Sequence, residues 1–403
     1  MISRRDTWFA YLLMVCQGFL FYAVGYITPY VESELGAPVW ASALPNSAMA
    51  VGLLVAGTIV PRVVHRLGAI GAVRLWALLM AGAALAMGLG ASLPVLLTGG
   101  FVVGLAGAGA LTHSVATFAG HRDGVLLMRA TLASVIGGVL GPLVLSAAAR
   151  GIGWSLGILA PVPLALAIAL LVPVGRGDVA AAASARSADR ATGDTAAPSP
   201  ARSRLEPRLP RAYWLAWTFL ALCIGAESSF VAWGAQVAVV RVGIPLADAT
   251  ALGSLFVVGL IVGRTGLGAG IGARVPPRTM LAAMVAVAVA GGLLVWAGQA
   301  VVLVGAGMLA GGLGMAGVWP TAAGVAVANA PRSPVLAGAR LNPATGVAAL
   351  VAPLVLGLVA AAAGILVAWG IVVGLLVVAF AVLRVVPSRH QDVSATEPGA
   401  PET

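Results

Sequence analysis

The sequence predicts an all-α polytopic membrane protein with twelve transmembrane helices in two bundles of six. Three observations predict it: the balance of apolar and charged residues, the length of the apolar runs, and a repeat relating the two halves of the chain. Of the 403 residues, 60% are hydrophobic and 9% are charged, whereas a soluble domain carries about 25% charged residues. So few polar groups cannot cover a water-facing surface, so we expect the chain to lie in a lipid bilayer.

The charged residues exclude several classes of protein. All 23 basic residues are arginine, and a Walker-type phosphate-binding loop or Schiff-base chemistry would need a lysine. The arginines lie between apolar runs rather than on one face, which argues against a nucleic-acid partner despite the net charge of +10. Cys16 and Cys223 lie inside apolar runs and set no disulfide framework. No cluster in the sequence has metal-ligand spacing, and we expect no cofactor.

Twelve apolar runs are long enough to cross the hydrocarbon core, which takes about 20 residues of helix. The first run continues through Tyr30 without a small-residue cleavage site, so we interpret it as a span rather than a signal peptide. The predicted spans are residues 8–30, 39–61, 73–92, 94–118, 125–149, 153–173, 212–238, 247–270, 279–298, 301–328, 341–363 and 365–386.

The arginines in the predicted loops indicate the orientation, because cytoplasmic loops are enriched in basic residues. The outer loops then hold only Arg150 and Arg241, alongside Glu32, Glu34 and Asp248. Both termini are therefore predicted to be cytoplasmic. The predicted cytoplasmic arginines are Arg62, Arg66, Arg74, Arg122, Arg129, Arg274, Arg278, Arg332, Arg340 and Arg389.

One long stretch interrupts the apolar pattern. Residues 174–211 are rich in Ala, Ser, Pro and Arg and have no apolar period, which is typical of a disordered linker. The predicted organisation is an N-terminal bundle (1–173), this cytoplasmic linker, a C-terminal bundle (212–386) and a cytoplasmic tail (387–403).

The two halves match each other in sequence. Residues 51–55 (VGLLV) recur as residues 258–262 (VGLIV), at an offset of 207. Ordered matches of this kind, with equal numbers of spans in each half, predict a duplication. The same offset pairs Cys16 with Cys223, Gly18 with Gly225 and Gly104 with Gly311, and an offset of 211 pairs Arg129 with Arg340 and residues 142–145 with 353–356.

Two six-helix halves joined by a long cytoplasmic linker resemble the major facilitator superfamily, in which the halves rock around a central site. The family's loop motif after the second span reads roughly Gly-x-Leu-x-Asp-Arg-x-Gly-Arg-Arg. Residues 61–70 (PRVVHRLGAI) keep Arg66 and Gly68 of this motif, while His65 replaces the aspartate and the trailing arginines are absent. The charge relay attributed to that aspartate therefore does not carry over intact.

The second half resembles the fucose-permease-like sugar symporters. The shared features are residues 225–229 (GAESS) followed by Trp233, the Gly-Arg pair ending at Arg264, and residues 312–321 (GLGMAGVWPT). Acidic residues in the core of such proteins are implicated in proton coupling, so the resemblance implies this role for Glu227. The first half has no matching acid in its spans.

Glu227 is the only acidic residue well inside a predicted span. A charge at the bilayer centre costs roughly 2.5–3.5 kcal/mol on insertion scales, so such an acid normally faces a cavity or a partner. We expect it to carry the coupling proton or to contact substrate. The alternative is a structural acid, protonated or paired with an arginine, that holds two helices together.

Further polar and aromatic side chains are candidates for a substrate cavity. Each has a structural alternative, such as an interhelical hydrogen bond for an amide or an interfacial anchor for a tryptophan. We also expect a kink at Pro320 that opens backbone groups to a cavity. The candidates are Gln17, Tyr22, Asn46, Ser47, Trp233, Trp319 and Thr321.

Arginines at the cytoplasmic ends of spans are candidates for an inner gate whose ion pairs break and form as the halves rock. Their alternative role is to set the topology and extend to the lipid headgroups. These candidates are Arg66, Arg129, Arg264 and Arg340.

These features predict a monomeric secondary transporter of the bacterial plasma (inner) membrane that moves a small molecule together with protons by alternating access. A proton-driven efflux pump for drugs or metabolites is the alternative, favoured by the similarity of Gly137, Gly141 and Pro142 to a drug-antiporter motif. A membrane sensor that keeps the fold without transport is a third possibility. One buried acid supplies neither the paired acids nor the nucleophile and base of an enzyme.

Overall fold

The computed structural model describes residues 4–118, 125–172, 209–267 and 275–387, and over these residues it is all-helical. Most of the predicted linker (174–211) and tail (387–403) lies outside the described residues, as do Arg122, Arg274 and Arg389.

In the first half, α4 consists of two helices joined at Gly68 and covers most of two predicted spans, 39–61 and 73–92. The span predicted at 125–149 has the predicted bounds. The helices are α1 (Arg4–Tyr26), α2 (Thr28–Ser33), α3 (Val39–Ser42), α4 (Leu44–Leu89), α5 (Leu93–Phe118), α6 (Val125–Ala149), α7 (Trp154–Gly157) and α8 (Val162–Leu171).

The second half follows the predicted spans within a few residues. The span predicted at 341–363 again has the predicted bounds. The helices are α10 (Arg211–Val242), α11 (Leu246–Gly266), α13 (Pro277–Ala297), α14 (Val301–Met315), α15 (Val318–Ala328), α16 (Pro334–Ala339), α17 (Leu341–Ala363) and α18 (Ile365–Val385).

Eleven helices within the described residues are long and apolar enough to cross a membrane. The longest candidate, Val39–Leu89, has 51 residues, more than twice the length that one crossing needs. Gly68 interrupts α4 with φ 74° and ψ 172°, a left-handed backbone that residues with a Cβ rarely adopt. The second and third predicted spans are therefore two helices that meet in a sharp kink at Gly68, where a loop was expected.

The tenth predicted span, 301–328, is divided into α14 and α15, with the break at Ala316–Gly317. Pro320 explains the break, because proline has no N–H to bond the carbonyl of the residue four positions earlier. That residue is Ala316, whose carbonyl oxygen is left for another donor. The kink predicted at Pro320 is therefore present, a few residues before the proline itself.

The predicted duplication is visible in how the helices pack. Gly52 of α4 lies so close to the carbonyl oxygen of Phe101 on α5 that a Cβ atom would overlap it. Gly259 of α11 lies against the carbonyl oxygen of Leu309 on α14 in the same way. Small residues let helix backbones approach closely in membranes, and the repeat has kept them at equivalent contacts.

The packing corrects one pairing of the repeat. Gly104 lies against the carbonyl oxygen of Met49, and the residue in the equivalent contact, against Phe256, is Gly312. The offset of 207 pairs Gly104 with Gly311 instead. The offset between the halves is therefore 208 at this contact, one residue more than at the earlier matches.

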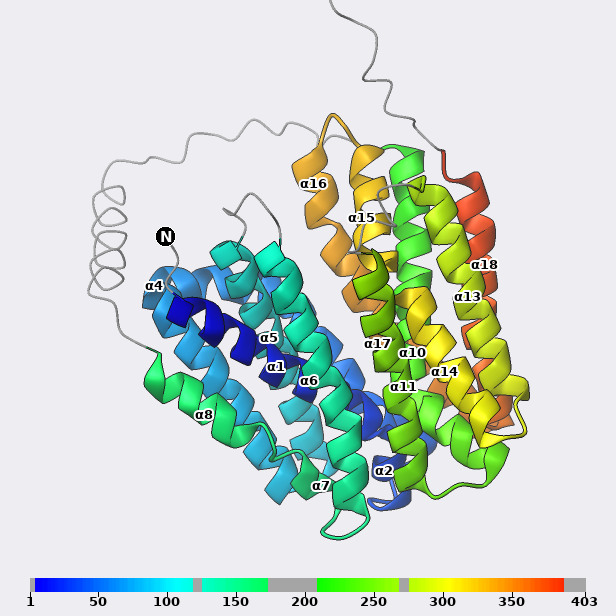
Figure 1. The fold of residues 1–403 in the computed structure, drawn as a ribbon, viewed down its shortest axis with the longest axis horizontal. Coiled ribbons are helices and arrows are strands. Elements are labelled where there is room, and N and C mark those ends of the chain that lie inside the picture. The colour runs from blue at the N-terminus through cyan, green and yellow to red at the C-terminus, as the bar shows by residue number, and fades with distance from the viewer. Residues whose placement is uncertain (1–3, 119–124, 173–208, 268–274, 388–403) are drawn as a thin grey trace, which may run out of the picture.

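The two halves lie side by side in Figure 1, α1–α8 in blue to green and α10–α18 in green to red. Their ribbons approach at the end where α2 and α7 lie, the α2 end, and diverge toward the end where α16 lies, the α16 end (Figure 1). Between the halves, α6 packs against α11 and α4 against α17. Residues from α1, α10 and α11 can therefore meet at the centre.

Candidate functional site

Glu227 lies near the middle of the 32-residue helix α10. Its side chain is half-buried, and its carboxylate accepts no hydrogen bond and forms no ion pair among the described residues. A carboxylate with no structural partner in the middle of a membrane helix is available to bind a proton or a ligand.

Arg264, in the last turn of α11, is held by the break between α14 and α15. Its Nε atom donates a hydrogen bond to the carbonyl oxygen of Ala316 at 3.2 Å. This is the oxygen that Pro320 leaves without a partner in its own helix. The guanidinium of Arg264 also interacts electrostatically with Glu227. The arginine expected to act in gating therefore lies in the same charged site as the buried acid.

Tyr22 brings the first half of the chain to this site. It is buried in α1, and its ring fills the space beside Gly138 of α6, where a Cβ atom would contact the ring closely. Its hydroxyl group interacts electrostatically with both Glu227 and Arg264. Helices α1, α10 and α11 thus converge on one charged site to which both halves contribute.

Gln17 forms an interhelical hydrogen bond within the first half. The hydroxyl of Ser134 on α6 donates to its Oε1 atom at 2.7 Å. Its amide nitrogen lies beside Gly107 of α5. The contact fits the structural alternative for this residue, and its contact with substrate remains a prediction. The sequence analysis did not select Ser134. The one signal for its role was its position one helical turn before Gly138.

Asn46 and Ser47 are both buried near the start of α4. The side-chain oxygen of Asn46 faces Gly25 of α1. The hydroxyl of Ser47 donates to the carbonyl oxygen of Leu350 on α17 at 3.2 Å, which connects the two halves. These two residues lie at the interface of the halves, on the side of the α2 end.

The two tryptophans have different surroundings. Trp233 is fully buried, and its indole N–H donates to the carbonyl oxygen of Pro353 on α17 at 3.0 Å. It is therefore part of the interior of the second half, where its N–H is satisfied. Trp319 is 44% exposed and Thr321 is half-buried, both in the first turn of α15.

The three other gating candidates lie apart from Glu227. Arg66 is exposed beside the kink at Gly68, and Arg129 is exposed near the start of α6. Arg340 is half-buried between α16 and α17, and its carbonyl oxygen accepts a hydrogen bond from Trp217 at 2.9 Å. The repeat-related pair, Arg129 and Arg340, therefore differs in burial, and the gating role of these arginines remains a prediction.

Two tyrosines connect the halves at the α2 end. The hydroxyl of Tyr26 donates to the carbonyl oxygen of Gly253 on α11 at 2.6 Å. The hydroxyls of Tyr30 and Thr250 are hydrogen-bonded at 3.0 Å.

Charged side chains add to these contacts at the α2 end. Arg150 and Asp248 form an ion pair at 2.5 Å, and the amide of Gln236 donates to Glu32 at 2.5 Å. We call these two pairs, with Tyr26–Gly253 and Tyr30–Thr250, the α2-end latch. Sequence reasoning did not select these residues as a site, although opposite charges in the predicted outer loops were a signal for it.

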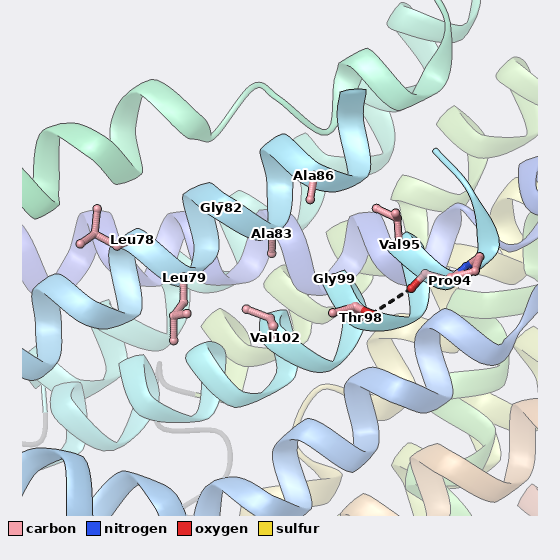
Figure 2. Close-up of a pocket in the computed structure, with 10 residues that line it drawn as sticks. All are labelled: Leu78, Leu79, Gly82, Ala83, Ala86, Pro94, Val95, Thr98, Gly99 and Val102. Carbon is pink, nitrogen blue, oxygen red and sulfur yellow. Dashed lines mark hydrogen bonds between the residues drawn. The ribbon is translucent and has the colours of Figure 1, made fainter. Parts of the chain in front are cut away.

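A separate pocket of about 440 Å³ lies between α4 and α5. Figure 2 shows it lined by apolar side chains such as Leu79, Val95 and Val102. Its one polar side chain, Thr98, donates its hydroxyl hydrogen to the carbonyl oxygen of Pro94 at 2.9 Å (Figure 2). The pocket offers no charge and no unused donor, unlike the site around Glu227.

The family of the chain follows from its sequence as well as from this architecture. A family model described as the Major Facilitator Superfamily matches residues 7–340. The chain belongs to this superfamily, and it is a membrane transporter rather than an enzyme. No curated protein sequence matches it.

Three solved structures with the same fold are distant from this chain in sequence. The nucleoside transporter NupG has a TM-score of 0.71 at 12% identity, over 94% of this chain and 98% of that one. A POT family transporter in complex with a thioalcohol-conjugated peptide has a TM-score of 0.70 at 12% identity, covering 95% of both chains. A bacterial homologue of the human lysosomal transporter Spinster, in an inward-facing conformation, has a TM-score of 0.64 at 14% identity, over 96% of this chain and 97% of that one. At these identities the likeness shows the fold alone.

Proposed function

We propose that the chain is a proton-coupled secondary transporter that carries a small molecule across the bacterial plasma membrane by alternating access. In this proposal α4 crosses the membrane twice, on either side of Gly68, which gives twelve crossings and places both termini in the cytoplasm. The monomer holds one central site between two six-helix halves.

One observation carries the proposal: the carboxylate of Glu227 is half-buried, central and without a hydrogen-bonding partner among the described residues. A structural acid in this position would be expected to form the ion pair with Arg264, because an unpaired buried charge is costly. Their interaction lies beyond ion-pair distance, so Glu227 can gain and lose a proton without breaking a structural contact.

The α2-end latch supports the alternating-access part of the proposal. Its ion pair and hydrogen bonds join the halves at the end that we assign to the outside. The ribbons diverge at the opposite end (Figure 1). This arrangement corresponds to a state that is closed to the outside, and transport requires the latch to break while the α16 end closes.

The test is proton-coupled transport by the purified protein in proteoliposomes, followed with a pH-sensitive dye inside the vesicles. The panel contains sugars, hydrophobic cations and small carboxylates. We expect a substrate-dependent pH change that is lost in Glu227→Gln, a substitution that keeps the size of the side chain. Ser228→Ala is the matched control, because its hydroxyl bonds only the Ile224 carbonyl oxygen of the same helix.

The outcomes separate the candidate functions. A pH change with sugars or carboxylates indicates symport, and a response to hydrophobic cations alone moves the protein to the efflux class. Normal transport by Glu227→Gln with unchanged pH dependence would remove Glu227 as the coupling residue. Solute transport without any proton movement would contradict proton coupling altogether.

A further inference from the structure

The guanidinium of Arg264 has hydrogen-bond donors that the protein does not use. Only Nε is engaged, with the carbonyl oxygen of Ala316, and the two Nη atoms donate to none of the described residues. The side chain is half-buried. A guanidinium in this state presents a planar fork of N–H groups, the geometry that binds a carboxylate with two parallel hydrogen bonds.

The protein backbone holds this fork in place. Pro320 leaves the Ala316 oxygen unpaired in its helix, and that oxygen receives the Arg264 Nε hydrogen. Arg264 therefore needs no acidic partner to fix its orientation. A pre-oriented charge of this kind loses little conformational freedom when a ligand binds.

Few charged groups surround the pair. Those that interact electrostatically with Glu227 are Arg264, Tyr22 and Cys223. Of the helices packed against α10, α14, α15 and α17 carry no ionisable side chain. In α13 and α18 the ionisable groups are Arg278 in the first turn and Arg384 in the last.

Toward the α2 end, the remaining neighbours of α10 carry the acids of the latch, Glu32 on α2 and Asp248 in the first turn of α11. Tyr30 of α2 and Tyr26 of α1 are hydrogen-bonded at the same end. Toward its other end α1 also carries Cys16, Tyr11 and, in its first turn, Arg4, Arg5 and Asp6. The charge of the central site is therefore set by one carboxylate and one guanidinium.

We propose that the transported molecule carries a single negative charge on a carboxylate group, and that Arg264 binds it when Glu227 is protonated. Ionised Glu227 balances the charge of Arg264 and repels an anion. Protonation of Glu227 leaves the positive charge unbalanced in a site of low dielectric, where an anion restores neutrality. Proton and anion then bind together and leave together. The inference rests on the proposed function, because it takes Glu227 as the coupling residue.

The rest of the transported molecule is uncharged in this proposal, because the first half has no charged side chain at the positions equivalent to Glu227 and Arg264. At the repeat positions of Glu227 and Arg264 the first half has Leu20 and Gly57. Leu20 is fully buried, and nothing lies within 4 Å of a Cβ placed on Gly57. The polar group that the first half brings to the site is the hydroxyl of Tyr22.

The test is ligand binding, measured without transport as the thermal stabilisation of the purified protein in detergent. The probes are a panel of small monocarboxylates, each matched with its neutral amide and with an amino acid of the same carbon skeleton. We expect stabilisation by monocarboxylates alone, stronger at mildly acidic than at mildly alkaline pH. Glu227→Gln should bind them equally at both pH values, because it mimics the protonated acid.

Arg264→Gln should weaken carboxylate binding by at least about tenfold, the loss expected when a charge-assisted hydrogen bond is removed. Arg264→Lys should bind with intermediate affinity, because it keeps the charge without the fork. Arg62→Gln is the control, an exposed arginine bonded to Thr58 of its own helix. The unfolding midpoint without ligand shows whether each variant is folded. If Arg264→Gln does not fold, Arg264→Lys is compared with the wild type instead.

Equal carboxylate binding by wild type and Arg264→Gln would overturn the proposal, as would stronger binding of the amides or amino acids. The result separates it from the proposed function. Proton-coupled transport of a neutral solute would be consistent with Glu227 as the coupling residue and would contradict an anionic substrate. Carboxylate binding at Arg264 that is independent of pH in the wild type would be consistent with the anion site and would contradict its coupling to Glu227.

Discussion

The two halves of this transporter share their packing and differ in their charge. Gly52 and Gly259 make the same close contact with a neighbouring helix. The central charged residues, Glu227 and Arg264, belong to the second half, and the first half has Leu20 and Gly57 at those positions. The contacts between helices are therefore constrained in both halves of the repeat, while the chemistry of the site has diverged between them.

This difference has a physical reason. A Cβ atom at either packing glycine would overlap a backbone oxygen, and a backbone cannot move aside without displacing its helix. A charge in the membrane is costly unless it has a function or a partner. One carboxylate and one guanidinium supply a balanced site, and a second pair would add the cost of removing two more charges from water without adding a function.

The largest effect is expected from placing the acid in the wrong half. Leu20→Glu puts a carboxylate at a fully buried position, at a cost of roughly 2.5–3.5 kcal/mol. We expect little folded protein in fluorescence-detected size-exclusion chromatography. The reciprocal Glu227→Leu should fold normally and lose proton coupling. A Leu20→Glu protein as stable as its Leu20→Met control would show that the two positions differ less than the structure indicates.

A smaller effect is expected from filling the packing contacts that the halves share. Gly52→Val and Gly259→Val should each destabilise the protein by about 1–3 kcal/mol, because overpacking displaces a neighbouring helix. Thermal unfolding in detergent measures the loss. Gly57→Ala, on the same helix as Gly52 but facing open space, is the control. Destabilisation by only one of the two valine variants would contradict the equivalence of the halves.

The smallest effect is expected at the α2-end latch. The side chains of Arg150 and Asp248 are 54% and 46% exposed, so their ion pair contributes less than about 1 kcal/mol. Arg150→Ala should leave the protein folded and shift it modestly toward the state open at the α2 end. Labelling of a single cysteine placed near that end measures the shift, and the charge swap Arg150→Asp with Asp248→Arg should reverse it. Unchanged labelling would remove this ion pair from the latch.

Much of the fold could be predicted from local composition. The spans predicted at 125–149 and 341–363 have the bounds of α6 and α17, because the length of an apolar run is fixed by the thickness of the membrane. The kink near Pro320 was equally predictable, since proline removes a hydrogen bond within its own helix. The boundary between the second and third spans was predicted as well, but the sequence did not show that the two helices meet at the single non-helical residue Gly68 rather than through a loop.

The candidate site was predicted only in part. Glu227 was selected because it is an acid inside an apolar run, and this needs no partner to be known. Trp233 was predicted to line the cavity; in the structure its N–H donates to the carbonyl oxygen of Pro353, and its contact with substrate remains a prediction. The rotation of a helix about its axis decides whether a side chain faces the centre or a neighbour, and the nearly uniform apolar faces of these helices give no signal for it.

From the sequence alone we could infer a membrane protein, the bounds of several of its helices, a repeat between its halves, and an acid inside one of its spans. Each of these depends on residues close together along the chain or on a comparison of the chain with itself. The fold was needed to show that Arg264 and Tyr22 share the site with Glu227 and that Ser134 donates a hydrogen bond to Gln17. Those partners come from different helices, and their meeting depends on how the helices pack rather than on any local pattern.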